Sequence, residues 1–164
     1  MKGSIMKLVK ANREKADELC KQDPVRPDLP LDWRVEENIR EVYYLESHVG
    51  NHRGTIPKID AVLCLAKCDR IPISEDEILT LPHGAFVVFY SVWSNTKGAG
   101  RQIIFDALDH YKELTKPCPG CPEYVFRYIT MSPKTEMAKN FHLRNGAVLL
   151  QENKETYNFE YMNE

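Results

Sequence analysis

The stretch SNTKGAGRQII, residues 94–104, decides how this chain can fold, and it directly follows the apolar run FVVFYSVW at residues 86–93. A nearly continuous apolar run of that length predicts a central β-strand that is covered on both faces. From residue 101 to residue 114 the apolar side chains recur on one helical stripe, which predicts a long α-helix. The glycines of the stretch therefore lie between a strand and the start of a helix.

Gly98 and Gly100 give this turn two alternative roles. A glycine turn between a strand and a helix is often purely structural, because glycine accepts unusual backbone dihedral angles. The same arrangement can hold a phosphate, because the first helical turn directs unpaired N–H groups and the positive end of the helix dipole outward. Lys97 and Arg101 add positive charge beside the loop. The spacing matches neither a Walker loop nor a Rossmann GxGxxG motif.

The composition is that of an ordinary globular protein. The chain has 164 residues, of which 43% are hydrophobic and 28% charged, so we expect a single domain over residues 1–164. The formal net charge of −2 offers no general attraction to nucleic acid or anionic lipid. No run is apolar enough to span a membrane, and the N-terminus lacks the apolar core of a signal peptide. We expect a cytoplasmic protein without nucleic-acid or membrane partners.

The five cysteines form an odd set without a secretory signal, and we expect them to be reduced thiols. Cys118 and Cys121 have the spacing of a metal knuckle, but a zinc site needs four ligands. Cys64 and Cys68 would lie about 13 Å apart along a strand, too far to share an ion as a pair. The CPGC segment is therefore interpreted as a rigid turn, with zinc as the less favoured alternative, and no metal is expected.

Hydrophobic periodicity and turn residues predict the order of the remaining elements. Strands are expected at 4–10, 38–45, 59–66, 85–93, 124–131, 147–150 and 156–162, helices at 13–21, 101–114 and 135–145, and a short capped helix or turn at 74–81. An irregular proline-rich loop is expected at 23–33, and a long loop at 48–57 should join two strands of a hairpin. This order indicates an α/β domain with a mixed sheet of about seven strands flanked by helices.

The glycine loop resembles the [RQ]-x-x-G-x-[GA] signature of the GNAT acyltransferase superfamily, with Asn95 at the Arg/Gln position. The segment TEMAKNFHLRNGAVL, residues 135–149, resembles that superfamily's N-x-x-A-x-x-L-Y-x-x-x-G-F. Gly146 matches the pattern, while Thr135 replaces Asn and His142 replaces Tyr. Two motifs in the expected order, on the expected elements, favour the phosphate-binding role of the loop.

This resemblance implies a fold and a ligand. In the GNAT fold, the strand at 85–93 would carry a bulge and splay from the strand at 124–131, leaving a cleft for the pantetheine arm of acyl-CoA. A backbone N–H near residues 90–92 would polarise the thioester carbonyl. Acetyl-CoA or another acyl-CoA would be the co-substrate, and a homodimer is compatible with the fold. The residues that the resemblance assigns to CoA binding are Tyr90, Ser91, Val92, Asn95, Lys97, Gly98, Ala99, Gly100, Arg101 and Thr135.

A second resemblance concerns the chemistry. The segments at 89–108, YITMSP at 128–133 and FHLRNGAVLLQEN at 141–153 resemble the C-terminal, GNAT-folded part of malonyl-CoA decarboxylase. That family pairs a histidine with a serine, so the resemblance implies catalytic roles for His142 and Ser132. Serine before proline is also typical of a helix start, which is the structural alternative for Ser132.

Three functions are compatible with these observations. The favoured one is acyl transfer from CoA to an unidentified small-molecule or protein amine, with His142 as an imidazolium that protonates the departing thiolate. Glu41 and Glu46 are candidate general bases, although a solvated strand face is the simpler interpretation, and Arg26 and Arg34 are candidate clamps for an acidic acceptor. The alternatives are a malonyl-CoA-type decarboxylase and a CoA-binding domain without chemistry.

Overall fold

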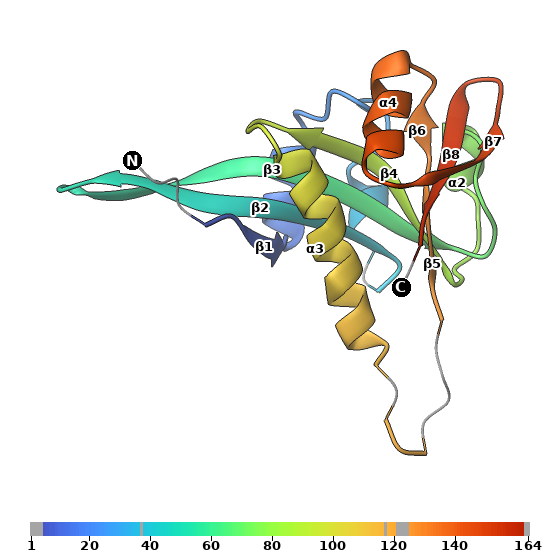
Figure 1. Cartoon of the computed structure of the whole chain (residues 1–164), viewed down its shortest axis with the longest axis horizontal. Helices are drawn as coiled ribbons and strands as arrows, with labels where there is room; N and C mark the ends of the chain where they lie inside the picture. The colour runs from blue at the N-terminus through green and yellow to red at the C-terminus, as the bar shows by residue number, and fades with distance from the viewer. Residues whose placement is uncertain (1–4, 37, 117, 121–124, 163–164) are drawn as a thin grey trace.

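The computed structural model describes residues 5–36, 38–116, 118–120 and 125–162. These residues form one eight-stranded mixed sheet with helices on both faces (Figure 1). The elements in chain order are β1 (Lys7–Lys10), α1 (Arg13–Cys20), the 3-10 helix η1 (Asp32–Val35), β2 (Arg40–Asn51), β3 (Gly54–Cys68), α2 (Glu75–Ile78), β4 (Phe86–Ser94), α3 (Ala99–Leu114), β5 (Arg127–Thr130), β6 (Ser132–Pro133), α4 (Glu136–Arg144), β7 (Val148–Glu152) and β8 (Thr156–Tyr161).

The sheet changes direction once, between β4 and β5. Strands β1 to β4 form an antiparallel meander, whereas β4 and β5 run parallel. Strand β5 then pairs antiparallel with β8, which also pairs with β6 and β7. The parallel contact places the carboxyl ends of β4 and β5 at the same edge of the sheet. Figure 1 shows the first turn of α3 and the helix α4 close to this edge.

Strand β3 lies between two cores, which explains why its sequence is apolar without alternation. On one face, Leu63 and Leu65 belong to the cluster built around α3. On the other face, Cys64 and Ala66 belong to the cluster that includes α1. Strand β4 alternates in the same way, as the continuous apolar run predicted. Each large apolar side chain buried in these cores contributes about 1.5–3 kcal/mol, so the sheet is fixed between its two layers.

The local predictions for the helices are confirmed with small shifts at their ends. The predicted stripe of α3 is buried on the sheet through Ile103, Ile104, Ala107, Leu108 and Tyr111. Ser74 caps α2, where its hydroxyl accepts a hydrogen bond from the N–H of Glu77 at 3.1 Å. Gly146 follows α4 with a positive φ of 89°, the left-handed conformation expected after a helix.

The prediction of a long loop at 48–57 is wrong. Strands β2 and β3 stay paired as far as Asn51 and Gly54, so they form a long two-stranded ribbon that extends beyond the rest of the sheet (Figure 1). Pro57 suggested a loop because it cannot donate a backbone hydrogen bond. In this ribbon neither β1 nor β4 continues alongside, according to the described pairings. A proline is tolerated on such an edge.

The described residues contain one strand more than the approximately seven predicted, because Ser132–Pro133 forms the short strand β6 on β8. The expectation that all cysteines are reduced is wrong for Cys118, which is disulfide-bonded. Cys121 and residues 1–4 lie outside the described residues.

No helix in the described ranges is long and apolar enough to cross a membrane.

Candidate functional site

A cavity of about 480 Å³ lies where β4 and β5 separate. The two strands pair from Phe86 to Phe89, and the final bond joins the N–H of Met131 to the carbonyl of Phe89 at 2.9 Å. Beyond this point β4 continues to Ser94, whereas the chain after β5 forms β6 against β8. The strands are therefore splayed, as expected, and the unpaired part of β4 lines the cavity together with α4.

Strand β4 carries a bulge at the point of separation. Opposite β3, Ser91 pairs with Cys64 and Phe89 pairs with Leu65, so Tyr90 is the extra residue. A bulge of this kind bends a strand and redirects the side chains that follow it. Bulge and splay thus coincide at one residue, and the strand predicted to hold the thioester is bent where the cavity begins.

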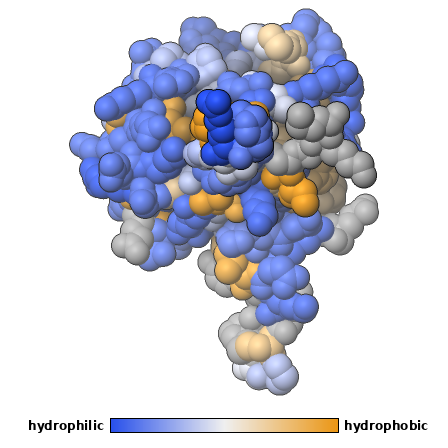
Figure 2. Space-filling view, turned by 90° about the vertical axis from the view of Figure 1, so that its left-hand side faces the viewer, coloured by the Kyte–Doolittle hydropathy of each residue, from blue (hydrophilic) through white to orange (hydrophobic). Residues whose placement is uncertain are grey.

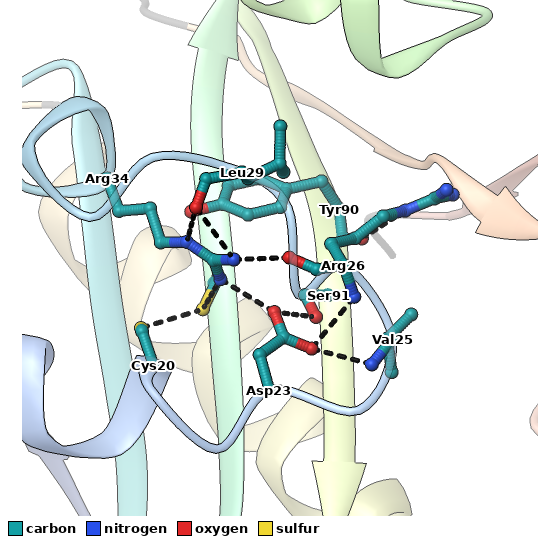
Figure 3. A network of polar contacts seen from close by, with 9 residues as sticks. Cys20, Asp23, Val25, Arg26, Leu29, Arg34, Tyr90 and Ser91 are labelled. Atoms are coloured by element: carbon teal, nitrogen blue, oxygen red, sulfur yellow. Dashed lines mark hydrogen bonds and ion pairs between the residues drawn. The ribbon is translucent and has the colours of Figure 1, made fainter.

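A buried polar network connects the loop between α1 and η1 to Ser91 on β4 (Figure 3). The Asp23 carboxylate accepts hydrogen bonds from Arg34 Nη1 at 2.6 Å and from the Ser91 hydroxyl at 2.7 Å. Its other oxygen accepts from the N–H groups of Val25 and Arg26 at 2.7 and 2.9 Å. The network fixes this loop, and Val25 forms part of the cavity wall.

Arg26 and Arg34 do not fit the hypothesis that they clamp an acidic acceptor. Arg26 donates to the carbonyls of Tyr90 at 3.4 Å and Met131 at 2.9 Å, so it bridges the two strands where they separate. Arg34 is 1% exposed and donates to the carbonyls of Arg26 and Leu29 as well as to the buried carboxylate. Their guanidinium groups satisfy buried acceptors and are not presented to a ligand.

The glycine loop is anchored to β3 by Asp60. The N–H of Asn95 donates to the Asp60 carbonyl at 2.7 Å, and the Thr96 hydroxyl donates to the Asp60 carboxylate at 2.5 Å. Gly98 has a φ of +82° and caps α3, so this position requires the left-handed conformation that glycine adopts at little cost. The loop is therefore held in a defined shape before the helix starts.

Gly100 allows α3 and α4 to approach each other. A Cβ atom at this position would lie 3.3 Å from the Cζ of Phe141, a contact tighter than side chains normally make. Within the described residues, no backbone carbonyl accepts from the N–H groups of Gly100 and Arg101. These two groups belong to the first turn of a sixteen-residue helix and remain available to an anion.

His142 lies on α4 at the cavity wall, and the residue is 6% exposed. Its Nδ1 is 2.7 Å from the hydroxyl of Tyr161 on β8, and its ring packs against Phe159 with 5.2 Å between ring centroids. Burial lowers the pKa of His142 to about 4, because the apolar surroundings disfavour the charged ring. The expectation of an imidazolium near neutral pH is therefore wrong: the ring is neutral.

Ser132 lines the same cavity as His142. It is 3% exposed and donates a hydrogen bond to the Thr130 hydroxyl at 2.8 Å. It does not cap α4, because the Thr135 hydroxyl accepts from the N–H of Ala138 and occupies that role. Among the described contacts, no hydrogen bond joins Ser132 to His142, so the two side chains share a cavity without forming a dyad.

The candidate bases on β2 lie away from the cavity. The Glu41 carboxylate contacts Lys10 Nζ at 2.8 Å and the hydroxyl of Tyr111 near the C-terminal end of α3. Glu46 pairs across the sheet with Lys7 on β1. Neither glutamate lines the cavity. Glu41 thus stabilises a buried polar cluster far along α3, a position that no local pattern in the sequence indicates.

No protein-family model and no curated protein matches the sequence, but the fold agrees with known structures. A GNAT-family acetyltransferase from Listeria monocytogenes aligns with a TM-score of 0.60 at 12% identity and covers 98% of each chain. The N-acetyltransferase PseH of Campylobacter jejuni, solved in complex with acetyl coenzyme A, aligns with a TM-score of 0.54 at 12% identity over 98% of this chain and 100% of that chain. The chain has the GNAT fold. A malonyl-CoA decarboxylase from Cupriavidus metallidurans aligns over 78% of this chain and 30% of that chain with 15% identity and a TM-score of 0.49, too low to support an inference.

Within this GNAT fold, the residues predicted to bind CoA gather around one cavity. Those that line it are Tyr90, Ser91, Val92, Gly100 and Thr135. Those that build the loop and first helical turn beside it are Asn95, Lys97, Gly98, Ala99 and Arg101. The Asn95 side chain donates to the carbonyl of Ile59 at 3.2 Å. In the part of the chain that is described, no three His, Cys, Asp or Glu side chains gather as a metal site.

Sequence reasoning missed Asp60, Asn145 and Tyr161, which support the loop and the histidine. No local motif marks them. Tyr161 is 19 residues from His142 along the chain, and only the packing of α4 over β8 brings the two rings together. The sequence at 156–162 predicted a strand but could not show what the Tyr161 hydroxyl would contact.

Proposed function

We propose that this protein binds acyl-CoA in the cleft between β4 and β5 and transfers the acyl group to an amine. The observation that carries the proposal is the continuity of the cleft with the glycine loop at the start of α3. One end of this path offers free backbone N–H groups, and the other offers an unpaired strand edge beside His142. Two proteins of the same fold, PseH and AtaTR, were solved with acetyl-CoA bound.

Each part of the cleft suits one part of acyl-CoA. The N–H groups of Gly100 and Arg101, with the Arg101 guanidinium nearby, would hold the pyrophosphate. The backbone of β4 after Phe89 has no partner strand and would bond the pantetheine amides as an added strand does. This alignment brings the thioester to the bulge at Tyr90, close to His142.

In transfer, the amine attacks the thioester carbon and the carbon–sulfur bond breaks. CoA leaves as the thiolate, and the proton that the amine loses passes through solvent to that thiolate. The cavity walls described here contain no Asp or Glu side chain. The acceptor would therefore arrive as the free amine, and the rate should rise with pH until that amine is deprotonated. His142, neutral at pH 7, would contribute a hydrogen bond to the reacting group and not a full positive charge.

Binding and transfer are tested separately. Isothermal titration calorimetry should show that acetyl-CoA binds the wild-type protein and that Gly98→Glu abolishes binding, because the glutamate places a negative charge in the anion site. Mass spectrometry with acetyl-CoA and a panel of amines and aminoacyl compounds should then show an acetylated product. Tight CoA binding without any product on a broad panel would contradict transfer while leaving CoA binding in place.

A second candidate function is decarboxylation of a malonyl-CoA-type substrate. It is favoured by one observation, that Ser132 and a neutral His142 line the same cavity. In this reaction the bond to the carboxylate carbon breaks, carbon dioxide leaves, and the resulting enolate takes a proton from solvent to give acetyl-CoA. The two side chains would donate hydrogen bonds to the enolate oxygen or the malonyl carboxylate.

Malonyl-CoA without an acceptor distinguishes the two functions. Appearance of acetyl-CoA in the mass spectrum, and its loss in His142→Ala, would establish decarboxylation. His52→Gln is a matched control, because His52 is exposed and lies on the distant β2–β3 ribbon. Intact malonyl-CoA would exclude this second candidate for the malonyl group.

A further inference from the structure

Four side chains form a line from the glycine loop to the catalytic candidate. Arg101 Nη1 donates to the Oδ1 of Asn145 at 3.0 Å. The Nδ2 of the same amide is buried and has no hydrogen-bond partner among the described residues. The Asn145 side chain also lowers the pKa of the neighbouring Tyr161 hydroxyl. That hydroxyl is in turn 2.7 Å from the Nδ1 of His142. The line joins the first turn of α3, the end of α4 and the last strand.

The guanidinium fixes which way the Asn145 amide points. An arginine side chain only donates, so it requires the amide oxygen on its side. The opposite orientation would place the amide N–H₂ group against another donor. With the oxygen on Arg101, the N–H₂ group is left for the side of Tyr161, whose pKa Asn145 lowers.

The direction of the hydrogen bond between Tyr161 and His142 follows from the number of donors that the phenol has. A phenol has one O–H. Because a buried N–H₂ group without an acceptor is costly, we assign the phenol oxygen, whose pKa the amide lowers, as the acceptor for Asn145. Burial raises the pKa of Tyr161 to about 12, with smaller opposing effects of Asn145 and Arg101, so the hydroxyl keeps its proton at neutral pH. Its hydrogen is therefore left for the Nδ1 of His142, which must accept and cannot carry a proton.

We propose that Asn145 and Tyr161 are positioning residues that hold His142 as the Nε2–H tautomer, so that the ring presents an N–H group to the acyl group in the cleft. This inference rests on the proposed function for its role, but its geometry stands independently of it. An Nε2–H can donate to a thioester oxygen, an enolate oxygen or the departing sulfur. It cannot remove a proton from the attacking amine, since its one lone pair is used by Tyr161.

The side chains that would set the tautomer of His142 also reach the proposed pyrophosphate site, through Arg101. Arg101 uses one N–H on Asn145 and has further N–H groups for a phosphate. Its guanidinium lies over the ring of Phe105 at 4.7 Å, which limits its movement. The same residue therefore contacts the proposed ligand and orients the amide that sets the histidine.

Nitrogen NMR of the protein labelled with ¹⁵N-histidine tests the proposal directly, because the ring nitrogens report which of them carries the proton. We expect the wild-type His142 signal at pH 7 to be that of the Nε2–H tautomer. The variant Asn145→Asp should instead give the signal of the Nδ1–H tautomer. The new carboxylate accepts the Tyr161 proton, and the phenol oxygen must then accept from an Nδ1–H. An Nδ1–H signal in the wild type would overturn the proposal even if no variant folds.

The matched control is Tyr128→Phe. Tyr128 is also a buried tyrosine, but its hydroxyl has no hydrogen-bond partner among the described residues. We expect the control to keep the wild-type tautomer, whereas Tyr161→Phe should give a mixture of tautomers. An unchanged spectrum in both Tyr161→Phe and Asn145→Asp would show that the line does not set the tautomer.

Kinetics separate this inference from the proposed function. Once a substrate is known, Asn145→Asp should lower kcat about 100-fold or more with little change in KM, as expected when one donor to the transition state is lost. Equal kcat for Asn145→Asp and wild type would overturn the positioning role. The predicted tautomer in a protein that binds no acyl-CoA would instead refute the proposed function and leave the geometry standing.

Discussion

Lowering the pH from 7 to 5 should destabilise this protein by about 2 kcal/mol through His142 alone. His142 is 6% exposed, and burial lowers its pKa to about 4 in the folded state, compared with 6.5 for an unperturbed histidine. Between these values the unfolded chain binds a proton that the folded chain does not. The contribution is therefore fully present above pH 6.5 and is lost as the pH falls toward 4.

The assay is urea denaturation at pH 7 and pH 5 for the wild type and for His142→Gln, which cannot titrate. Carboxylates such as Glu41 also change with pH, but they change equally in both proteins and cancel in the comparison. A difference of about 2 kcal/mol corresponds to about 4–8 °C in Tm for a domain of this size. His52→Gln, at an exposed position, should keep the wild-type pH dependence.

Equal pH dependence in the wild type and in His142→Gln would refute the reasoning. It would mean that the folded ring titrates near 6.5, and so is charged or well solvated. The ring would then be partly charged near neutral pH, and the imidazolium expected from the sequence would be available again.

Three further predictions follow from the contacts described above. Thr96→Val should weaken acetyl-CoA binding several-fold, as measured by calorimetry, without loss of fold, because it removes the hydroxyl that bonds the glycine loop to Asp60. Unchanged affinity would show that the shape of the loop does not depend on this hydrogen bond. Gly98→Ala should cost about 1 kcal/mol in urea denaturation, since the residue keeps a φ of +82°, and no cost would indicate that the loop adopts another conformation. Asp23→Ala should destabilise the fold by about 3–5 kcal/mol because it leaves Arg34 charged, buried and unpaired, and a loss below 1 kcal/mol in the same assay would show that the network of Figure 3 is dispensable.

Much of the fold was predictable because it depends on local chemistry. The apolar run before residue 94, the glycines and the stripe of α3 specify a strand, a turn and a helix through period and backbone freedom. The hairpin ribbon was not predictable, since its Gly and Pro residues favour a loop locally. Cross-strand pairing from His48–Pro57 to Asn51–Gly54 overrides that preference. Strand β6 was missed for the same reason, because it exists only through β8.

The candidate site was likewise predictable only where local chemistry determines it. Local sequence was sufficient to place the glycine turn at the start of a helix, because two glycines, a helix start and flanking charge are adjacent in the chain. It was also sufficient to put His142 and Ser132 among the cavity residues, through motif resemblance. Neither the charge of His142 nor its proton position could be read locally. These depend on burial beside Phe159 and on a hydroxyl 19 residues away, and both exist only once α4 packs on β8.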